Sequence, residues 1–266
     1  MSTRRRLDAE LVRRGLARSR EHAAELVTAG RVVVAGQSAG KTATQVTAGD
    51  PIAVTGAGAG PEYASRGGRK LAGALAAFPG LSVAGRRCLD AGASTGGFTD
   101  VLLRAGAAQV VAVDVGYGQL AWALRSDDRV TVLDRVNVRH LEPGQVAPAP
   151  SLVTADLSFI SLGLVLPALV RCAAPDADFL LLVKPQFEVG KGRVGAGGVV
   201  RDPELRAAAV SAVATAAADS GLGVAGATAS PLPGPAGNVE YFLWLRRGAP
   251  PLEAARLAQV IAEGPQ

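Results

Sequence analysis

The second part of the chain, after residue 62, alternates short apolar runs with helical segments, and this alternation limits the fold more than any other feature of the sequence. One helical segment, GGFTDVLLRAG, closes on Gly106, and a long alanine-rich segment opens with Asp202 and Pro203 and ends near Gly221. Strands that alternate with helices in this way are typical of a doubly wound α/β sheet with mainly parallel strands. The predicted parallel strands are RRCLDAG, AQVVAVDVG, RVTVLD, SLVTADLS and DFLLLVKP.

The last two apolar runs of the chain favour a different pairing. LGVAGATAS and NVEYFLWL are separated by the turn-rich segment PLPGPAG. Short runs joined by a segment rich in proline and glycine are typical of antiparallel neighbours. We therefore expect an antiparallel pair at one edge of the sheet.

The first 60 residues have a different organisation. Leu7, Leu11 and Leu16 recur at helical spacing over residues 7–16, and Ser19 is suited to cap a second helix that ends at Gly30. The β-branched runs RVVVAG, TATQV and DPIAV then favour short strands joined by turns. We expect a small α+β domain over residues 1–60 and an α/β domain over residues 63–266, joined by the glycine-rich linker TGAGAGPE at about 55–62.

Positive charge is concentrated in the first domain. Residues 1–60 contain nine Lys or Arg and five Asp or Glu, a net charge of +4, whereas the remaining 206 residues carry a net charge of +1. Arginines gathered at the ends of short helices are suited to a folded RNA backbone, although a solvated basic face would have the same composition. The predicted RNA contacts are Arg4, Arg5, Arg6, Arg14, Arg18, Arg20 and Lys41, with Arg66 in the second domain.

The sequence lacks the features of several other classes of protein. Its longest apolar stretch, from Phe159 to Val170, contains Pro167 and is shorter than the roughly 20 residues of a membrane-spanning helix. The basic N-terminus is not followed by the apolar core of a secretory signal. Cys88 and Cys172 do not have the spacing of a zinc site or a disulfide framework. We therefore expect a cytoplasmic protein with no bound metal, no membrane contact and no obligate protein partner.

A glycine-rich loop follows the first strand of the predicted sheet, in the segment CLDAGASTGGFTD. Ligands of such sheets bind beyond the carboxyl ends of the strands, and glycine lets the backbone turn tightly beside a ligand. Asp114 lies 22 residues after Gly92, where an acid at the end of a second strand accepts from ribose hydroxyls. The glycine spacing is not that of dinucleotide or nucleoside triphosphate sites, and it favours S-adenosylmethionine over another nucleotide or a structural turn. The predicted cofactor contacts are Asp90, Gly92, Ala93, Ser94, Thr95, Gly96, Gly97, Phe98 and Asp114.

Four further polar residues adjoin apolar runs: Lys70, Asp156, Lys184 and Glu240. Asp156 and Lys184 each end a strand, at a partly buried edge where an unpaired charge is unfavourable. Each residue alone has an ordinary interpretation, as a surface lysine, a turn or cap, or an edge-strand acid. Together, two lysines and two carboxylates near the cofactor indicate a site that moves a proton.

Several segments also resemble known families. The first domain resembles the S-four-like RNA-binding domain named after a small-subunit ribosomal protein, through LDAELVRRGLARSREHA and the turn AGRVVVAG. The whole chain resembles the TlyA family of ribosomal-RNA ribose methyltransferases, which is also described as hemolysin-like. The matching motifs occur in family order: SRGGRKL, LDAGASTGGFTD, DVGYGQL, ADLSFISL, VKPQFEVGKG and SPLPGPAGNVEYF. This resemblance implies a Rossmann-like, S-adenosylmethionine-dependent methyltransferase domain, similar to the FtsJ-like enzymes, that follows a small N-terminal α+β RNA-binding domain.

The same resemblance implies roles for individual residues. It implies a catalytic tetrad of Lys70, Asp156, Lys184 and Glu240, and it adds Asn137 and Asp156 as weaker cofactor contacts. The implied reaction is 2'-O-ribose methylation of cytidine in ribosomal RNA, and the implied partners are the small ribosomal subunit, the large one or both.

The chemistry of ribose methylation requires a base. A ribose hydroxyl is a poor nucleophile, so its proton must be removed as the oxygen attacks the methyl group. We assign this role to Lys184, with Lys70 favouring the neutral amine or placing the ribose, and with the two carboxylates orienting these groups. Two alternatives stay open. One is a noncatalytic ribosome- or RNA-binding protein, and the other is a pore-forming hemolysin, which needs an amphipathic or membrane-spanning segment.

Overall fold

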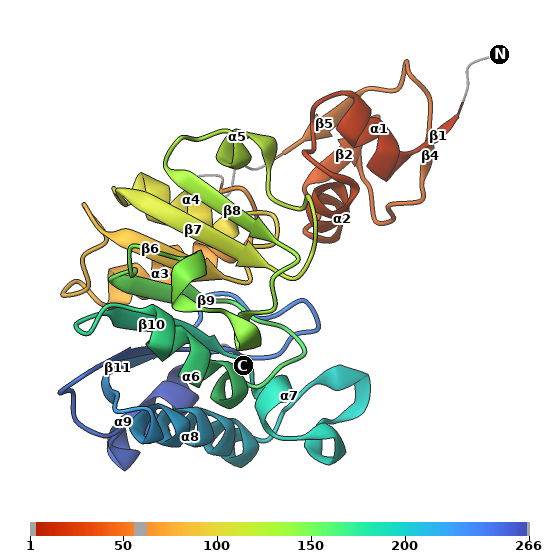
Figure 1. Ribbon diagram of the computed structural model, residues 1–266. Coiled ribbons are helices and arrows are strands. Elements are labelled where there is room, and N and C mark those ends of the chain that lie inside the picture. Colours follow the sequence, from red (N-terminus) through yellow and green to blue (C-terminus); the bar gives the residue numbers. More distant parts are fainter. Residues whose placement is uncertain (1–3, 56–62, 265–266) are drawn as a thin grey trace. The chain divides into compact units, whose positions relative to one another are not determined.

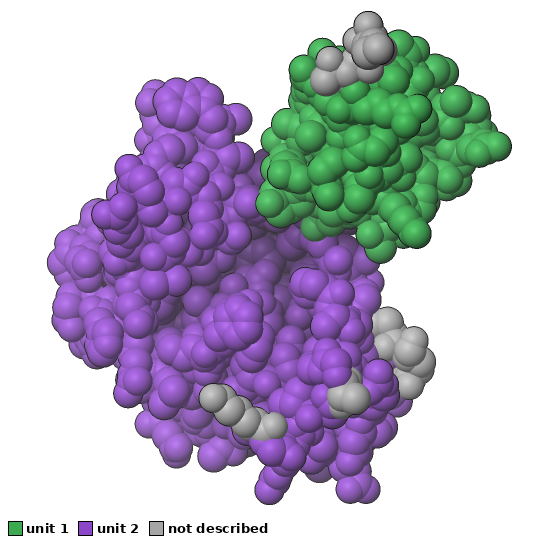
Figure 2. All heavy atoms as spheres, turned by 90° about the vertical axis from the view of Figure 1, so that its right-hand side faces the viewer, with its two compact units in different colours: residues 1–62 green, residues 63–266 purple. Residues whose placement is uncertain are grey.

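The computed structural model describes residues 4–55 and 63–264. The chain divides into two compact units, residues 1–62 and residues 63–266, which are coloured separately in Figure 2. Each unit has its own hydrophobic core. The predicted linker at 55–62 lies, apart from Thr55, outside the described residues.

The first unit packs two short helices against small strands (Figure 1). Its helices are α1 (Leu7–Arg13) and α2 (Arg20–Thr28), and its strands are β1 (Arg5–Arg6), β2 (Val32–Val34), β3 (Gln37–Ser38), β4 (Gln45–Val46) and β5 (Ile52–Val54). Strand β1 pairs with β4, and β2 pairs with both β3 and β5. Buried leucines and valines from both helices and from β2 and β4 fill the core.

The predicted helices of this unit are present, with one earlier end. The side chain of Ser19 accepts a hydrogen bond from the backbone N–H of His22 and caps α2, as predicted. Helix α1 ends at Arg13 instead of continuing to residue 16, because Gly15 adopts a left-handed φ of +70°.

The second unit is built on a seven-stranded sheet. Its strands are β6 (Arg87–Ala91), β7 (Gln109–Asp114), β8 (Val130–Asp134), β9 (Leu152–Ala155), β10 (Asp178–Val183), β11 (Gly223–Ala229) and β12 (Tyr241–Arg246). The order across the sheet is β11-β12-β10-β9-β6-β7-β8. The strands from β10 to β8 are parallel, and β12 runs antiparallel to both β10 and β11. The mainly parallel sheet with an antiparallel pair at one side is therefore confirmed.

Helices cover both faces of this sheet (Figure 1). Helices α3 (Gly67–Ala77), α4 (Gly97–Arg104) and α5 (Trp122–Arg125) share a core with one face, and α6 (Leu162–Cys172), α8 (Pro203–Asp219) and α9 (Ala254–Glu263) share a core with the other. The short helix α7 (Pro185–Glu188) follows β10. This three-layer arrangement is the expected Rossmann-like architecture.

One helix of the second unit was predicted from the sequence, and another was not. Helix α8 begins as predicted, because Asp202 accepts from the backbone N–H of Glu204 and Pro203 occupies the first helical position. Helix α9 was not predicted, although it buries Val260 and Ile261 against the core.

The strand order also fixes where a ligand can bind. The chain runs from β6 outward to β7 and β8 on one side, and later to β9 and β10 on the other side. The loops that leave β6 and β9 therefore turn to opposite faces of the sheet. A crevice opens between them at the carboxyl ends of these two strands. The glycine loop follows β6, and Asp156 follows β9.

Candidate active site

Neighbouring strands bring three of the predicted tetrad residues to one edge of the sheet. Asp156 directly follows β9, Lys184 directly follows β10, and Glu240 directly precedes β12. Because β12 runs antiparallel to β10, with Tyr241 opposite Val183, the start of β12 lies beside the end of β10. The order β12-β10-β9 thus places the three residues next to one another.

The tetrad is arranged as two lysine–carboxylate pairs. Nζ of Lys70, on α3, lies 2.5 Å from Oε2 of Glu240, and the two side chains are only 5% and 1% exposed. Nζ of Lys184 lies 2.6 Å from Oδ1 of Asp156 and donates to Oγ of Ser158 at 2.9 Å. Charges that are this far removed from water are retained only when they are paired. The structure therefore supplies two buried or half-buried ion pairs at the cofactor edge.

Close backbone packing places α3 in the site. A Cβ atom added at Gly97 would lie 2.8 Å from the backbone nitrogen of Gly68 and 2.3 Å from Oγ of Ser65. A Cβ atom at Gly67 would lie 3.7 Å from Oδ2 of Asp156, so the first turn of α3 adjoins the Lys184 pair. Glycine at position 97 thus allows the approach that brings α3, and with it Lys70, to the sheet.

Replacing Gly97 with alanine is expected to lower the free energy of unfolding by about 1–3 kcal/mol, the usual effect of overpacking. The turnover number should fall further than this loss of stability explains, because displacement of α3 moves Lys70. Urea unfolding and methyl-transfer assays measure the two effects. Gly163→Ala is the matched control in the first turn of α6, since its Cβ would meet Ala216 and Ser161 at an ordinary 3.5 Å. Equal behaviour of the two variants would contradict the proposed packing role.

A cavity of about 490 Å³ adjoins the Lys184–Asp156 pair. This volume falls within the range of small-molecule sites. Five predicted cofactor contacts line it, and they come from the end of β7 and from the loops after β6, β8 and β9: Gly92, Ser94, Asp114, Asn137 and Asp156. The cavity therefore lies in the crevice that the strand order predicts.

Asp114 is held in a fixed orientation at this cavity. One carboxylate oxygen accepts from the backbone N–H of Ser94 at 2.8 Å, and the other accepts from that of Gly116 at 2.7 Å. Each oxygen keeps a further lone pair, so the carboxylate can still accept from a ribose hydroxyl. Gly92 has a φ of +85°, and a Cβ atom there would lie 2.6 Å from the backbone oxygen of Asp156. Glycine at this position permits both the turn and the close approach of the two loops.

The other predicted loop residues do not line the cavity: Asp90, Ala93, Thr95, Gly96, Gly97 and Phe98. Asp90 is fully buried and accepts from Oγ1 of Thr99 at 2.7 Å, and burial raises the pKa of its carboxyl group to about 7. Gly96, with a φ of +96°, packs against leucine side chains of the loop after β7 and of α5. The ring of Phe98 stacks on that of Phe242 with centroids 6.1 Å apart. Asp90, Gly96 and Phe98 therefore support the loop from the interior of the protein.

Two residues that the sequence analysis did not select join the loops after β9 and β10. Phe159 is 92% exposed, has a φ of +64° and lies with its ring centroid 5.1 Å from that of Phe187. Glu188 accepts from Oγ of Ser161 at 2.6 Å and from the backbone N–H of Leu162 at 2.9 Å, and burial raises the pKa of its carboxyl group. Exposure of an aromatic ring within an apolar motif, ADLSFISL, is not visible in the sequence alone.

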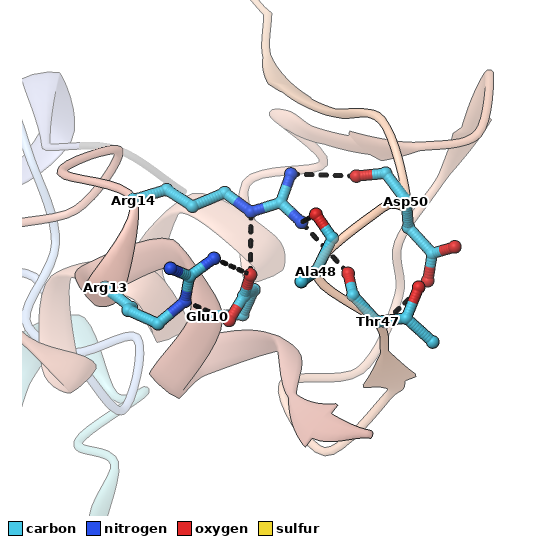
Figure 3. A network of polar contacts seen from close by, with 6 residues as sticks. All are labelled: Glu10, Arg13, Arg14, Thr47, Ala48 and Asp50. Carbon is cyan, nitrogen blue, oxygen red and sulfur yellow. Dashed lines mark hydrogen bonds and ion pairs between the residues drawn. The ribbon is translucent and has the colours of Figure 1, made fainter. Parts of the chain in front are cut away.

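The predicted RNA-contacting residues fall into two groups. Arg4, Arg5, Arg6, Arg18, Arg20 and Lys41 are exposed. Arg14 is half-buried, and Figure 3 shows that its guanidinium group is bound to Glu10 and to the backbone oxygens of Thr47, Ala48 and Asp50. Arg66 is also half-buried and donates to the backbone oxygen of Pro233. The guanidinium groups of Arg14 and Arg66 therefore bind backbone oxygens of the protein, whereas the side chains of the first group are exposed.

Comparison with known proteins identifies the family. Residues 63–247 match the FtsJ-like methyltransferase family, and residues 5–52 match the S4 domain. A Mycobacterium tuberculosis protein named 16S/23S rRNA (cytidine-2'-O)-methyltransferase TlyA is 60% identical over 271 aligned residues that cover 100% of both chains. This chain belongs to the TlyA family.

Two further relatives agree with this membership. A Campylobacter jejuni TlyA protein, named 23S rRNA (cytidine-2'-O)-methyltransferase, is 34% identical over 68% of this chain and 70% of its own. A solved structure of a Streptococcus thermophilus protein, provisionally named a hemolysin, is 39% identical with a TM-score of 0.79, and the match covers 99% of this chain and 96% of that one.

Membership of the TlyA family makes this chain a methyltransferase with an RNA substrate, and its methyl donor is S-adenosylmethionine. The cavity residues fit that donor, because Asp114 presents fixed acceptors for a ribose and Gly92 leaves room beside the loop after β9. Among residues 4–55 and 63–264, the structure contains no helix of the length and apolarity needed to cross a membrane.

Proposed function

We propose that this protein methylates the ribose 2'-hydroxyl of cytidine in ribosomal RNA of the small subunit, the large subunit or both. The observation that carries the proposal is the pair of lysine–carboxylate contacts beside the cofactor cavity, because ribose methylation needs a base and no metal or covalent nucleophile. The relatives named for this activity support the choice of cytidine and of ribosomal RNA.

We assign the proton-accepting role to Lys184. S-adenosylmethionine, when bound, supplies an electrophilic methyl group on its sulfonium. In the ion pair with Asp156, 2.6 Å away, Lys184 is an ammonium, so it must first release a proton to solvent before its amine accepts the proton of the 2'-hydroxyl as the oxygen attacks; Asp156 then stabilises the ammonium that forms again. The Lys70–Glu240 pair orients the ribose and contributes a second cation at the site. We assign binding of the cofactor to Asp114 and Asn137, which line the cavity.

Phe159 is suited to contact the base that carries the target ribose. Unpaired bases in RNA are commonly held by stacking on aromatic side chains. The ring is 92% exposed and belongs to the cavity wall on the side of Asp156. We propose that it stacks on the target nucleotide, and that the exposed arginines of the first unit bind the surrounding RNA backbone. Since ribosomes assemble in the cytoplasm, we propose that the enzyme acts there.

The test is transfer of labelled methyl groups from S-adenosylmethionine to purified small and large ribosomal subunits that lack 2'-O-methylcytidine. Mass mapping of the product should locate the label on the ribose of a cytidine. Label on a base would contradict the proposed reaction. Cofactor binding without transfer to either subunit would instead favour the noncatalytic RNA-binding alternative.

A further inference from the structure

A nearly buried carboxylate in the first unit joins two of the exposed arginines. Asp8, the second residue of α1, has a side chain that is 7% exposed. Its Oδ2 accepts from Nη2 of Arg6 at 2.9 Å and from Nη2 of Arg20 at 3.1 Å, and its Oδ1 accepts from Nε of Arg6 at 3.1 Å. Arg6 belongs to β1 and Arg20 opens α2. One carboxylate thus brings together guanidinium groups from two other elements.

The neighbouring carboxylate has a different effect on its arginines. Glu10 is 1% exposed and binds both Arg13 and Arg14 (Figure 3). Arg14 also donates hydrogen bonds to three backbone oxygens of residues 47–50, and its side chain is only 20% exposed. Its N–H donors are therefore used within the protein. Arg6 and Arg20 remain 45% and 58% exposed. Glu10 therefore anchors Arg14 inward and holds only Arg13 at the surface, where it is 45% exposed, whereas both arginine partners of Asp8 lie at the surface.

The arginines held by Asp8 keep donors for another ligand. Within the part of the chain that the structure describes, Nη1 of Arg6 and both Nε and Nη1 of Arg20 donate to no recorded acceptor. Two guanidinium groups would otherwise repel each other, and each long side chain loses rotamer entropy when it is fixed. The buried carboxylate compensates both effects before a ligand arrives. Its arginine partners also hold the pKa of the Asp8 carboxyl group well below its usual range, so it stays ionised.

We propose that Asp8 is a positioning residue that holds Arg6 and Arg20 as a two-guanidinium clamp for a backbone phosphate of the RNA substrate. Guanidinium groups bind phosphate oxygens through paired N–H donors, and such contacts fix the register of a protein on nucleic acid. The inference rests on the proposed function, because it takes ribosomal RNA as the ligand of the first unit.

The variant Asp8→Asn distinguishes a positioning role from a simple charge effect, because the two predict opposite changes in affinity for RNA. The substitution removes one negative charge from an RNA-binding surface, so electrostatics alone predicts tighter binding. Loss of positioning predicts weaker binding, and we expect affinity for purified ribosomal subunits to fall about 5–10-fold at fixed salt, the value of one to two hydrogen bonds. Glu21→Gln is the matched control, because it removes the same charge from an exposed position of α2 that acts on Arg20 through its charge alone, and it should leave affinity unchanged or raise it. Asp8→Glu keeps the charge but displaces the carboxylate, and it should also weaken binding.

A mutant cycle separates positioning from a general loss of structure. In an Arg6→Ala/Arg20→Ala background, Asp8→Asn should cause no further loss, since its effect acts through the two arginines. Circular dichroism and thermal unfolding report whether each variant is folded. Binding at or above wild-type strength in both folded Asp8 variants overturns the positioning role alone. Unchanged binding in the folded double arginine variant overturns the clamp itself, and it leaves the proposed methylation and the other exposed cations of the first unit untouched.

Discussion

Replacement of Lys184 by alanine is expected to lower the turnover number for methyl transfer by about 10²–10⁴-fold, the contribution of a positioned general base. The amine lies against Asp156 and Ser158, at 2.6 Å and 2.9 Å, and it is 10% exposed, so water does not readily replace it. Affinity for S-adenosylmethionine should be retained, because Asp114 holds the other end of the cavity. Single-turnover assays with ribosomal subunits and calorimetric titration of the cofactor measure the two quantities.

Variants of matched charge and shape sharpen this test. Lys184→Arg keeps the positive charge, but a guanidinium group does not deprotonate in proteins, so this variant should be as inactive as alanine. Ser158→Ala removes one acceptor and leaves the amine, and it should lower turnover by no more than about tenfold, the value of one hydrogen bond. Small primary amines added to Lys184→Ala should restore part of the rate. Near wild-type turnover in the arginine variant would show that the residue supplies charge and not a base.

Strand endings explain why much of the site could be predicted from the sequence. Asp114, Asp156 and Lys184 each terminate an apolar run, and parallel strands of one sheet end at the same edge, so their proximity follows from the pattern. Glu240 was assigned to the tetrad through the resemblance to the TlyA family, and the antiparallel return of β12 beside β10 is what brings it to this edge. Its pairing with Lys70 depends on where α3 packs, which a single sequence does not specify.

The features that were missed depend on tertiary packing in the same way. The glycine loop was expected to approach a ligand throughout, yet Gly97 is glycine because α3 packs against it. Arg14 and Arg20 have the same charge and lie six residues apart, but only the structure distinguishes a guanidinium bound to the backbone from one that faces solvent. Composition predicts how basic a surface is, whereas buried acids such as Asp8 and Glu10 decide which cations are available on it.

Removing one member of the Lys70–Glu240 pair is expected to have the largest effect on stability. Glu240→Leu leaves Lys70 buried without a partner and should lower the free energy of unfolding by about 3–5 kcal/mol. The double variant Lys70→Met/Glu240→Leu should regain most of this loss, because an apolar pair of similar volume avoids the desolvation of both charges. Urea unfolding of the wild type, the single variant and the double variant gives the three free energies. A single variant as stable as the wild type would mean that the Lys70 amine finds water or another acceptor.

Methyl transfer by the same proteins then separates stability from chemistry. A buried ion pair is often less favourable for folding than an apolar pair of similar volume, so we propose that the Lys70–Glu240 pair is retained for a role in the reaction. The stable double variant should therefore remain inactive even though it binds the cofactor, since it has neither the cation nor the carboxylate beside the ribose. If turnover returned along with stability, the pair would be structural, and the proton transfer would depend on Lys184 and Asp156 alone.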